Sequence, residues 1–220
     1  MEPAVSQVLV KSKSISNQNN CKRVIFSSFV FMFIYNKQNM HMTTRILFTG
    51  AQGTGKTSVM NVLPCSIQQV RNITRTVAKN NNLSINTESS DESQAAIFNA
   101  YLKALSRDDF FVSERSLLDV FAYTLYQSSI GKCSGGLVRS QERELKTFVQ
   151  KHKNDVYVYF PIEFDPVADG VRSVDKEYQK AIDWYIQDNL KALKINYIQV
   201  TGTVEERKKQ VEELIKKYNK

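Results

Sequence analysis

The residues of this chain best suited to chemistry form one short glycine-rich segment, which reads GAQGTGKTS from Gly50 to Ser58. It matches the P-loop pattern G-x-x-x-x-G-K-[ST], whose backbone N–H groups wrap around a phosphate. We expect Lys56 to reach the β- and γ-phosphates of ATP and the Thr57 hydroxyl to bind Mg²⁺. The segment therefore predicts a nucleotide site with ATP and Mg²⁺ as cofactors. The predicted nucleotide-binding residues are Gly50, Gly53, Thr54, Gly55, Lys56, Thr57 and Ser58.

A second charged site follows the apolar run that ends at Ser113. Glu114 comes directly after this run, at the expected end of a strand, where it can face the P-loop across a sheet. A carboxylate in that place can bind Mg²⁺ through water or accept the proton of an attacking hydroxyl. Arg115 offers a planar, permanently charged guanidinium to a phosphate. The alternative interpretation is a surface Glu-Arg pair that closes a strand.

A third site lies in the irregular stretch from Glu163 to Ser173, which contains Asp169-Gly170-Val171-Arg172. A loop of this kind is typical of a lid that closes over phosphates and excludes water. Arg172 is then expected to supply positive charge to the transferring phosphoryl group, as an arginine finger of the same chain. The alternative is an ordinary turn that carries a solvated arginine.

Three further residues are candidates for binding the molecule that accepts the phosphoryl group. Arg75 follows an expected strand and can hold a phosphate of the acceptor, although a solvated helix arginine is the alternative. Asp119 and Tyr123 lie four residues apart on the helix after Glu114, so they share one face and can contact a sugar or a base. Tyr123 is equally compatible with a place in the core.

The elements that must position these residues alternate along the chain. Short apolar runs predict strands at 45–49, 67–73, 110–113, 156–160 and 195–200. Helical patterns follow at 56–64, 74–80, 93–106, 117–126, 138–153 and 174–193, and a Thr203–Glu206 capping box starts a last helix. This alternation predicts an α/β fold with a mostly parallel sheet covered on both faces. In such a fold, ligands gather at the carboxyl ends of the strands.

Composition divides the chain into an N-terminal extension, residues 1–41, and a P-loop domain, residues 42–220. Five basic side chains and one acidic side chain lie in the extension, which accounts for half of the net charge of +8. The extension is expected to be disordered or loosely docked, and its apolar run at 24–35 is too short to span a bilayer. Three scattered cysteines and two histidines disfavour disulfides, a histidine-based zinc site and a Ser/His triad, as in a reduced cytoplasmic protein.

Taken in order, these motifs resemble the NadR-like P-loop domains, which are akin to nicotinamide riboside kinases and to small nucleoside and nucleotide kinases, including those of bacteriophages. The resemblance covers roughly residues 43–216 and also includes Val200-Thr201-Gly202 with Glu206-Arg207. It implies a five-stranded parallel sheet of the nucleoside-kinase type. It further implies that Glu114-Arg115 line the active site, that Arg172 is the lid arginine, and that the segment around Gly202 lies near the adenine.

Three functions remain open from the sequence. The first is a kinase that moves the γ-phosphoryl group of Mg·ATP to a nucleoside, a nucleoside monophosphate or a ribosyl-pyridine. The second is a regulatory ATPase, which transfers the group to water. The third is a 5′-end kinase of nucleic acid, a minor alternative because no basic stripe interleaved with aromatic residues is present. The expected partner is a small nucleotide or nucleoside. No membrane partner is expected, and formation of a homodimer remains open.

Overall fold

The computed structural model describes residues 44–84, 89–164 and 175–219. The N-terminal extension and the segment 169–172, with Arg172, lie outside these ranges, so the predictions made for them stay predictions. Within the described residues, no helix is long and apolar enough to cross a lipid bilayer.

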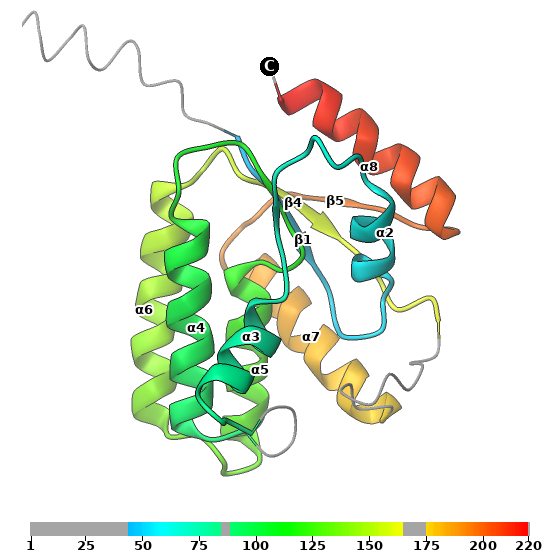
Figure 1. Ribbon diagram of the computed structural model, residues 1–220. Helices are drawn as coiled ribbons and strands as arrows, with labels where there is room; N and C mark the ends of the chain where they lie inside the picture. The colour runs from blue at the N-terminus through cyan, green and yellow to red at the C-terminus, as the bar shows by residue number, and fades with distance from the viewer. Residues whose placement is uncertain (1–43, 85–88, 165–174, 220) are drawn as a thin grey trace, which may run out of the picture. The chain divides into compact units, whose positions relative to one another are not determined.

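A five-stranded parallel sheet forms the centre of the described domain, as predicted (Figure 1). The strand order is β2-β3-β1-β4-β5, and every neighbouring pair is parallel. The strand that precedes the P-loop therefore lies in the middle, with Ile46 opposite both Val112 and Val156. The strands are β1 (Ile46–Thr49), β2 (Gln69–Val70), β3 (Val112–Ser113), β4 (Val156–Tyr159) and β5 (Tyr197–Gln199).

Helices cover both faces of the sheet (Figure 1). On one face α2 (Lys56–Val62) packs against α8 (Val204–Tyr218). On the other face lie α4 (Asp91–Leu105), α5 (Leu117–Ser129), α6 (Gly135–Lys151) and α7 (Lys176–Ala192). The short helix α3 (Ile73–Asn80) packs against α4. This layered arrangement confirms the predicted α/β class.

The two faces of β1 belong to two different hydrophobic clusters. Leu47 packs into the cluster built with α4, α5, α6 and α7. Ile46 and Phe48 point to the opposite cluster, which contains Val59 of α2 and Val211 of α8. Alternation of side chains along a strand explains this division. Both layers are therefore fixed to the strand that carries the P-loop.

The element boundaries differ from the prediction mainly around β2. The predicted strand at 67–73 is reduced to Gln69–Val70, and α3 begins at Ile73. Asn72 causes the break because its backbone has a φ of 58°, which neither a strand nor a right-handed helix accepts. The predicted capping box of α8 is confirmed, since the side chains of Thr203 and Glu206 each accept the other residue's backbone N–H.

Two buried arginines stabilise opposite ends of the domain. Arg45, directly before β1, makes a two-pronged ion pair with Asp155, with N–O distances of 2.7 and 2.5 Å. This pair lies at the amino end of the sheet, away from the P-loop that follows Thr49. The second buried arginine, Arg207 of α8, lies on the P-loop side and belongs to the site described next.

Candidate active site

The P-loop after β1 has the backbone geometry that its glycines predict. Gly50, Gly53 and Gly55 all have positive φ angles, of 142°, 76° and 87°. At Gly50 a side chain has no room, because a Cβ atom there would lie 2.5 Å from the carbonyl oxygen of Phe160. Helix α2 then begins at Lys56, and no side chain caps its first N–H groups. These N–H groups and the helix dipole are suited to hold an anion.

Lys56 lies inside the curve of the loop and is almost fully buried. Its Nζ donates to the carbonyl oxygens of Gly50 and Ala51 at 2.5 and 2.6 Å, and to the Thr54 hydroxyl at 3.1 Å. The ammonium group is therefore placed at the position where the loop would receive phosphates.

Glu114 meets the P-loop, as its position after β3 predicts. Its Oε1 accepts a hydrogen bond from the Thr57 hydroxyl at 2.5 Å, and its Oε2 accepts the backbone N–H of Asn72 at 3.3 Å. Burial raises the pKa of Glu114, but the Thr57 bond and the charge of Arg115 outweigh it, so the net pKa is lowered. The carboxylate is therefore ionised at neutral pH, which suits binding of a cation or an orienting contact better than strong basicity.

Thr57 and Glu114 together fit a Mg²⁺ ion. One hydroxyl oxygen and one carboxylate oxygen, 2.5 Å apart at the start of α2, are hard ligands of the type that Mg²⁺ prefers. In the described part of the chain, no three His, Cys, Asp or Glu side chains are grouped to hold a metal ion by themselves. A Mg²⁺ site of the P-loop type does not require such a group, because substrate phosphates and water complete the coordination there. When bound, the ion would neutralise charge on the phosphates.

Asp119 lies beneath the loop, fully buried. Its Oδ1 accepts the Thr49 hydroxyl, the Gly50 N–H at 3.2 Å and the Ser116 hydroxyl at 3.3 Å. Burial raises the pKa of this carboxyl, opposed by the charges of Lys56 and Arg115. Its Oδ2 has no hydrogen-bond partner among the described residues. The contact of Asp119 with a sugar or base stays a prediction. Oδ2 is the carboxylate oxygen that would make it, because Oδ1 already accepts three hydrogen bonds.

Arg115 and Tyr123 connect Asp119 to the loop from the side of α5. The Nη1 atom of Arg115 lies 3.9 Å from Asp119 Oδ2 and donates to the Tyr123 hydroxyl at 3.4 Å. Its guanidinium also lies over the Tyr123 ring, 5.2 Å from the ring centre. Tyr123 in turn donates to Oε1 of Gln52 at 2.9 Å, and the backbone oxygen of Gln52 accepts from Gln179 of α7 at 2.7 Å. Gln52 could not be predicted from the sequence because it occupies a variable position of the motif.

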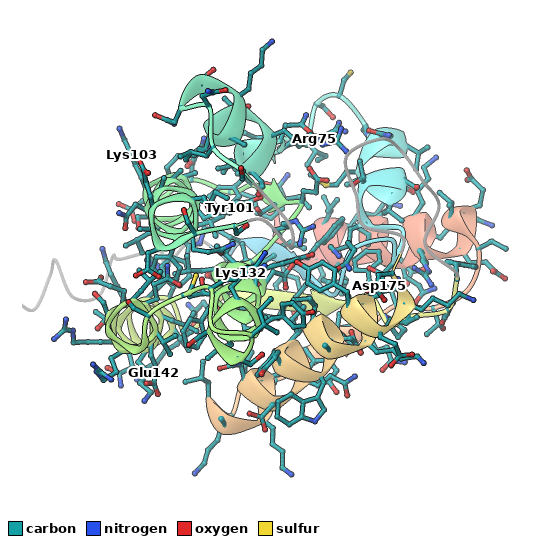
Figure 2. The ribbon with its side chains drawn as sticks, turned by 90° about the horizontal axis from the view of Figure 1, so that it is seen from below. Arg75, Tyr101, Lys103, Lys132, Glu142 and Asp175 are labelled. Atoms are coloured by element: carbon teal, nitrogen blue, oxygen red, sulfur yellow. The ribbon has the colours of Figure 1, made fainter. Side chains whose placement is uncertain are left out.

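Arg75 lies in the first turn of α3, exposed to solvent. In Figure 2 it projects from the side of α3 that faces α2. Asn72, three residues earlier, contacts Glu114, so Arg75 is about one helical turn from the acidic residue. Tyr101 of α4 meets the same turn, with its hydroxyl 3.4 Å from that of Thr74. Arg75 is therefore placed at the border of the site rather than inside it.

A buried acidic residue of α7, Asp183, also supports the loop and was missed by the sequence analysis. Its two oxygens accept the Tyr159 hydroxyl at 2.9 Å, and its pKa is raised by burial, opposed in part by these hydrogen bonds and by the charge of Lys56. The Ala51 backbone N–H, in the loop, also lowers this pKa. The signal was hidden because an acidic residue in an amphipathic helix normally indicates the solvent face.

Gly202 and Arg207 close the other side of the loop. The Gly202 N–H donates to Oε2 of Glu163 at 2.9 Å, and Nη2 of Arg207 binds the same oxygen at 2.7 Å. The Nη1 atom of Arg207 donates to the carbonyl oxygen of Thr54 at 2.5 Å. Glu163 was predicted only as the start of an irregular stretch, and nothing in the sequence indicates that it meets Gly202.

The described site residues thus converge on one edge of the sheet, at the carboxyl ends of β1, β3 and β4. Of the predicted catalytic residues, Lys56, Glu114 and Arg115 lie together there, and Arg172 lies outside the described residues. Ser58 is exposed in the first turn of α2. Three helices hold the loop from different sides: α5 through Asp119, α7 through Gln179, and α8 through Arg207.

This fold and loop define an α/β P-loop domain built on a five-stranded parallel sheet. Residues 45–207 match the family described as an AAA domain, and the chain belongs to this family. No curated protein sequence matches the chain.

Solved structures with the same fold include NadR in complex with NAD and AMP-PNP (13% identity, TM-score 0.62) and NadR in complex with NR (14%, 0.63). The matches cover 81% and 82% of this chain and 50% and 53% of the NadR chains, so this chain spans about half of their length. A deoxyadenosine kinase from M. mycoides with bound dATP is also similar, with 14% identity, a TM-score of 0.53, and 82% of this chain and 100% of that chain covered. These likenesses confirm the predicted fold.

Proposed function

We propose that the protein is an ATP-dependent kinase that moves the γ-phosphoryl group of Mg·ATP to a nucleoside, a nucleoside monophosphate or a ribosyl-pyridine. The observation that carries this proposal is the contact between Glu114 and Thr57, which brings a carboxylate from the end of β3 to the phosphate end of the P-loop. The fold itself, shared with NadR and deoxyadenosine kinase, suggests ATP-dependent phosphoryl transfer.

In this proposal the loop N–H groups and Lys56 bind the β- and γ-phosphates, and Thr57 with Glu114 holds Mg²⁺. Glu114 also orients the attacking hydroxyl of the acceptor, for which an ionised carboxylate is the suitable hydrogen-bond acceptor. Arg115 and Arg172 provide positive charge where the transferring group becomes more negative.

The acceptor is proposed to lie between α3 and α5, beside Tyr123. Arg115 over the Tyr123 ring offers both a cation and an aromatic face, which suits a substrate that combines a flat base with a polar sugar. Arg75 at the border of this region suits a phosphate on the acceptor. Gly202 is proposed to lie near the adenine of ATP.

The AAA domain family description favours one second candidate, an ATPase that transfers the phosphoryl group to water. The deciding experiment measures ADP release by the full chain with Mg·ATP alone and with a panel of acceptors. The panel holds nucleosides, nucleoside monophosphates, nicotinamide riboside and 5′-hydroxyl oligonucleotides, and Lys56→Ala serves as the inactive control. A kinase releases ADP much faster with one small acceptor than without any. Equal release with every acceptor would favour the ATPase, and stimulation by the oligonucleotide alone would favour a 5′-end kinase.

A further inference from the structure

The side chain of Arg207 connects three segments that are far apart in the sequence. It is 1% exposed and bridges the Thr54 carbonyl oxygen of the P-loop and the carboxylate of Glu163, which follows β4. The same carboxylate oxygen accepts the N–H of Gly202, in the turn between β5 and α8. A buried arginine with a carboxylate partner is an ordinary way to stabilise a fold, so its function depends on what else it touches.

The feature that sets Arg207 apart is that its backbone partner belongs to the P-loop. The C=O of Thr54 and the N–H of Gly55 belong to one planar trans peptide unit, so they point in opposite directions. Arg207 donates to this carbonyl oxygen, so the Gly55 N–H of the same peptide is directed away from the guanidinium. Gly55 has a φ of 87°, and a Cβ atom there would lie 3.2 Å from Nη1 of Arg207. The guanidinium and the glycine therefore fix this peptide together.

The charge of Arg207 is balanced at the site. The Glu163 carboxylate, 2.7 Å from Nη2 of Arg207, neutralises the guanidinium. The pKa of Glu163 is lowered, first by the hydrogen bond from the Gly202 N–H and also by Arg207. The guanidinium also lies over the rings of Phe160 and Phe164, 5.7 and 5.0 Å from their centres. Because the pair is neutral as a unit, its effect on a bound anion comes from the orientation of the peptide rather than from added positive charge.

We propose that Arg207 is a positioning residue of the phosphate-binding loop, and that Glu163 holds its guanidinium in place. Arg207 keeps the Gly55 N–H directed at the phosphates, so the affinity for a polyphosphate depends on it even though its guanidinium binds the carbonyl end of that peptide. The inference rests on the proposed function in one respect, namely that the loop binds a nucleotide.

The test compares Arg207→Lys with Arg45→Lys in the full chain. Both changes remove a buried guanidinium that binds a carboxylate and a carbonyl oxygen, but Arg45 lies at the opposite end of the sheet. Calorimetry gives the dissociation constants of Mg·ATP and of inorganic tripolyphosphate, which lacks the base and sugar. Thermal unfolding is measured for each variant, because both changes are expected to lower the unfolding midpoint.

We expect Arg207→Lys to raise both dissociation constants about 10-fold or more, as for a lost charged hydrogen bond, while Arg45→Lys leaves them unchanged. If Arg207→Lys does not fold, Glu163→Gln replaces it as the test variant, because the partly exposed Glu163 can be changed with less risk to folding. Glu163→Gln should raise both dissociation constants by a smaller factor. A loss of ATP affinity without loss of tripolyphosphate affinity would overturn the inference, since Arg207 would then act on the base. Unchanged constants in the variant that folds would overturn it as well. Failure of the unmodified chain to bind either probe would instead overturn the proposed function together with the inference.

Discussion

The Thr57 hydroxyl and the Glu114 carboxylate are 57 residues apart in the sequence and 2.5 Å apart in the structure. Thr57 belongs to the first turn of α2, and Glu114 follows β3, the neighbour of β1 in the sheet. Parallel pairing of β1 with β3 is what brings them together, because it places both carboxyl ends at one edge. The P-loop hydroxyl and the strand-end carboxylate are thus joined by one hydrogen bond.

Replacing Glu114 by Gln should lower kcat about 100-fold while ATP still binds. The amide keeps the size of the side chain and can accept the Thr57 hydroxyl, but it carries no negative charge to orient a hydroxyl or hold a cation. Steady-state kinetics with the best acceptor and calorimetry with ATP separate the two effects. The matched control is Glu142→Gln, a partly exposed acid on α6 away from the site in Figure 2. An unchanged kcat would remove Glu114 from the mechanism.

The pKa of Glu114 should depend on its hydrogen bond with Thr57. The pKa of Glu114 is lowered from 4.5, so the carboxylate stays charged as the pH falls from neutral to that value, and kcat should show no acid limb above it. Thr57→Ala removes the hydrogen bond and should raise the pKa of Glu114, whereas Thr57→Ser keeps it. Carbon NMR of the labelled Glu114 carboxyl measures this pKa without requiring activity. Identical midpoints in the Ala and Ser variants would contradict the assigned contact.

Tyr123→Phe should raise the KM for the acceptor about 5-fold and leave the ATP dissociation constant unchanged. The ring remains, but the hydroxyl that accepts from Arg115 and donates to Gln52 is lost, which costs about 1 kcal/mol, the typical net value of a hydrogen bond. Tyr126→Phe, on the same helix and packed against Tyr178, is the control. Equal effects of the two changes would show that Tyr123 serves the core only.

Arg75→Ala should chiefly weaken binding of an acceptor that carries a phosphate. Arg75 stands at the border of the site, where its guanidinium can pair with such a group. The KM for a nucleoside monophosphate should rise about 10-fold or more, and that for the matching nucleoside should hardly change. Lys103→Ala, an exposed cation on α4, is the control (Figure 2). An unchanged KM for the monophosphate would show that Arg75 does not contact the acceptor.

The sequence predicted the layers of the fold and the edge where the site forms, because strand runs and a P-loop are local patterns. It could not predict where α5 directs its polar face. The spacing of Asp119 and Tyr123 shows that they share a face, but only packing decides that Asp119 points beneath the loop at Gly50. The resemblance includes Arg207, but its contact with Glu163 was hidden for the same reason. Each residue looks like a solvated charge until the sheet brings β4, β5 and the loop together. The early end of β2 came from one left-handed residue, Asn72.

The division of β1 between two hydrophobic clusters has a consequence for how the molecule opens. Leu47 belongs to one cluster, and Ile46 and Phe48 belong to the other. Neither layer of helices can therefore detach without exposing apolar side chains of the central strand to water. The domain should therefore behave as a single cooperative unit, in which the amide hydrogens of β1 exchange with solvent only when the whole domain unfolds. The segment that supports the nucleotide loop is then the last part of the domain to lose its protection.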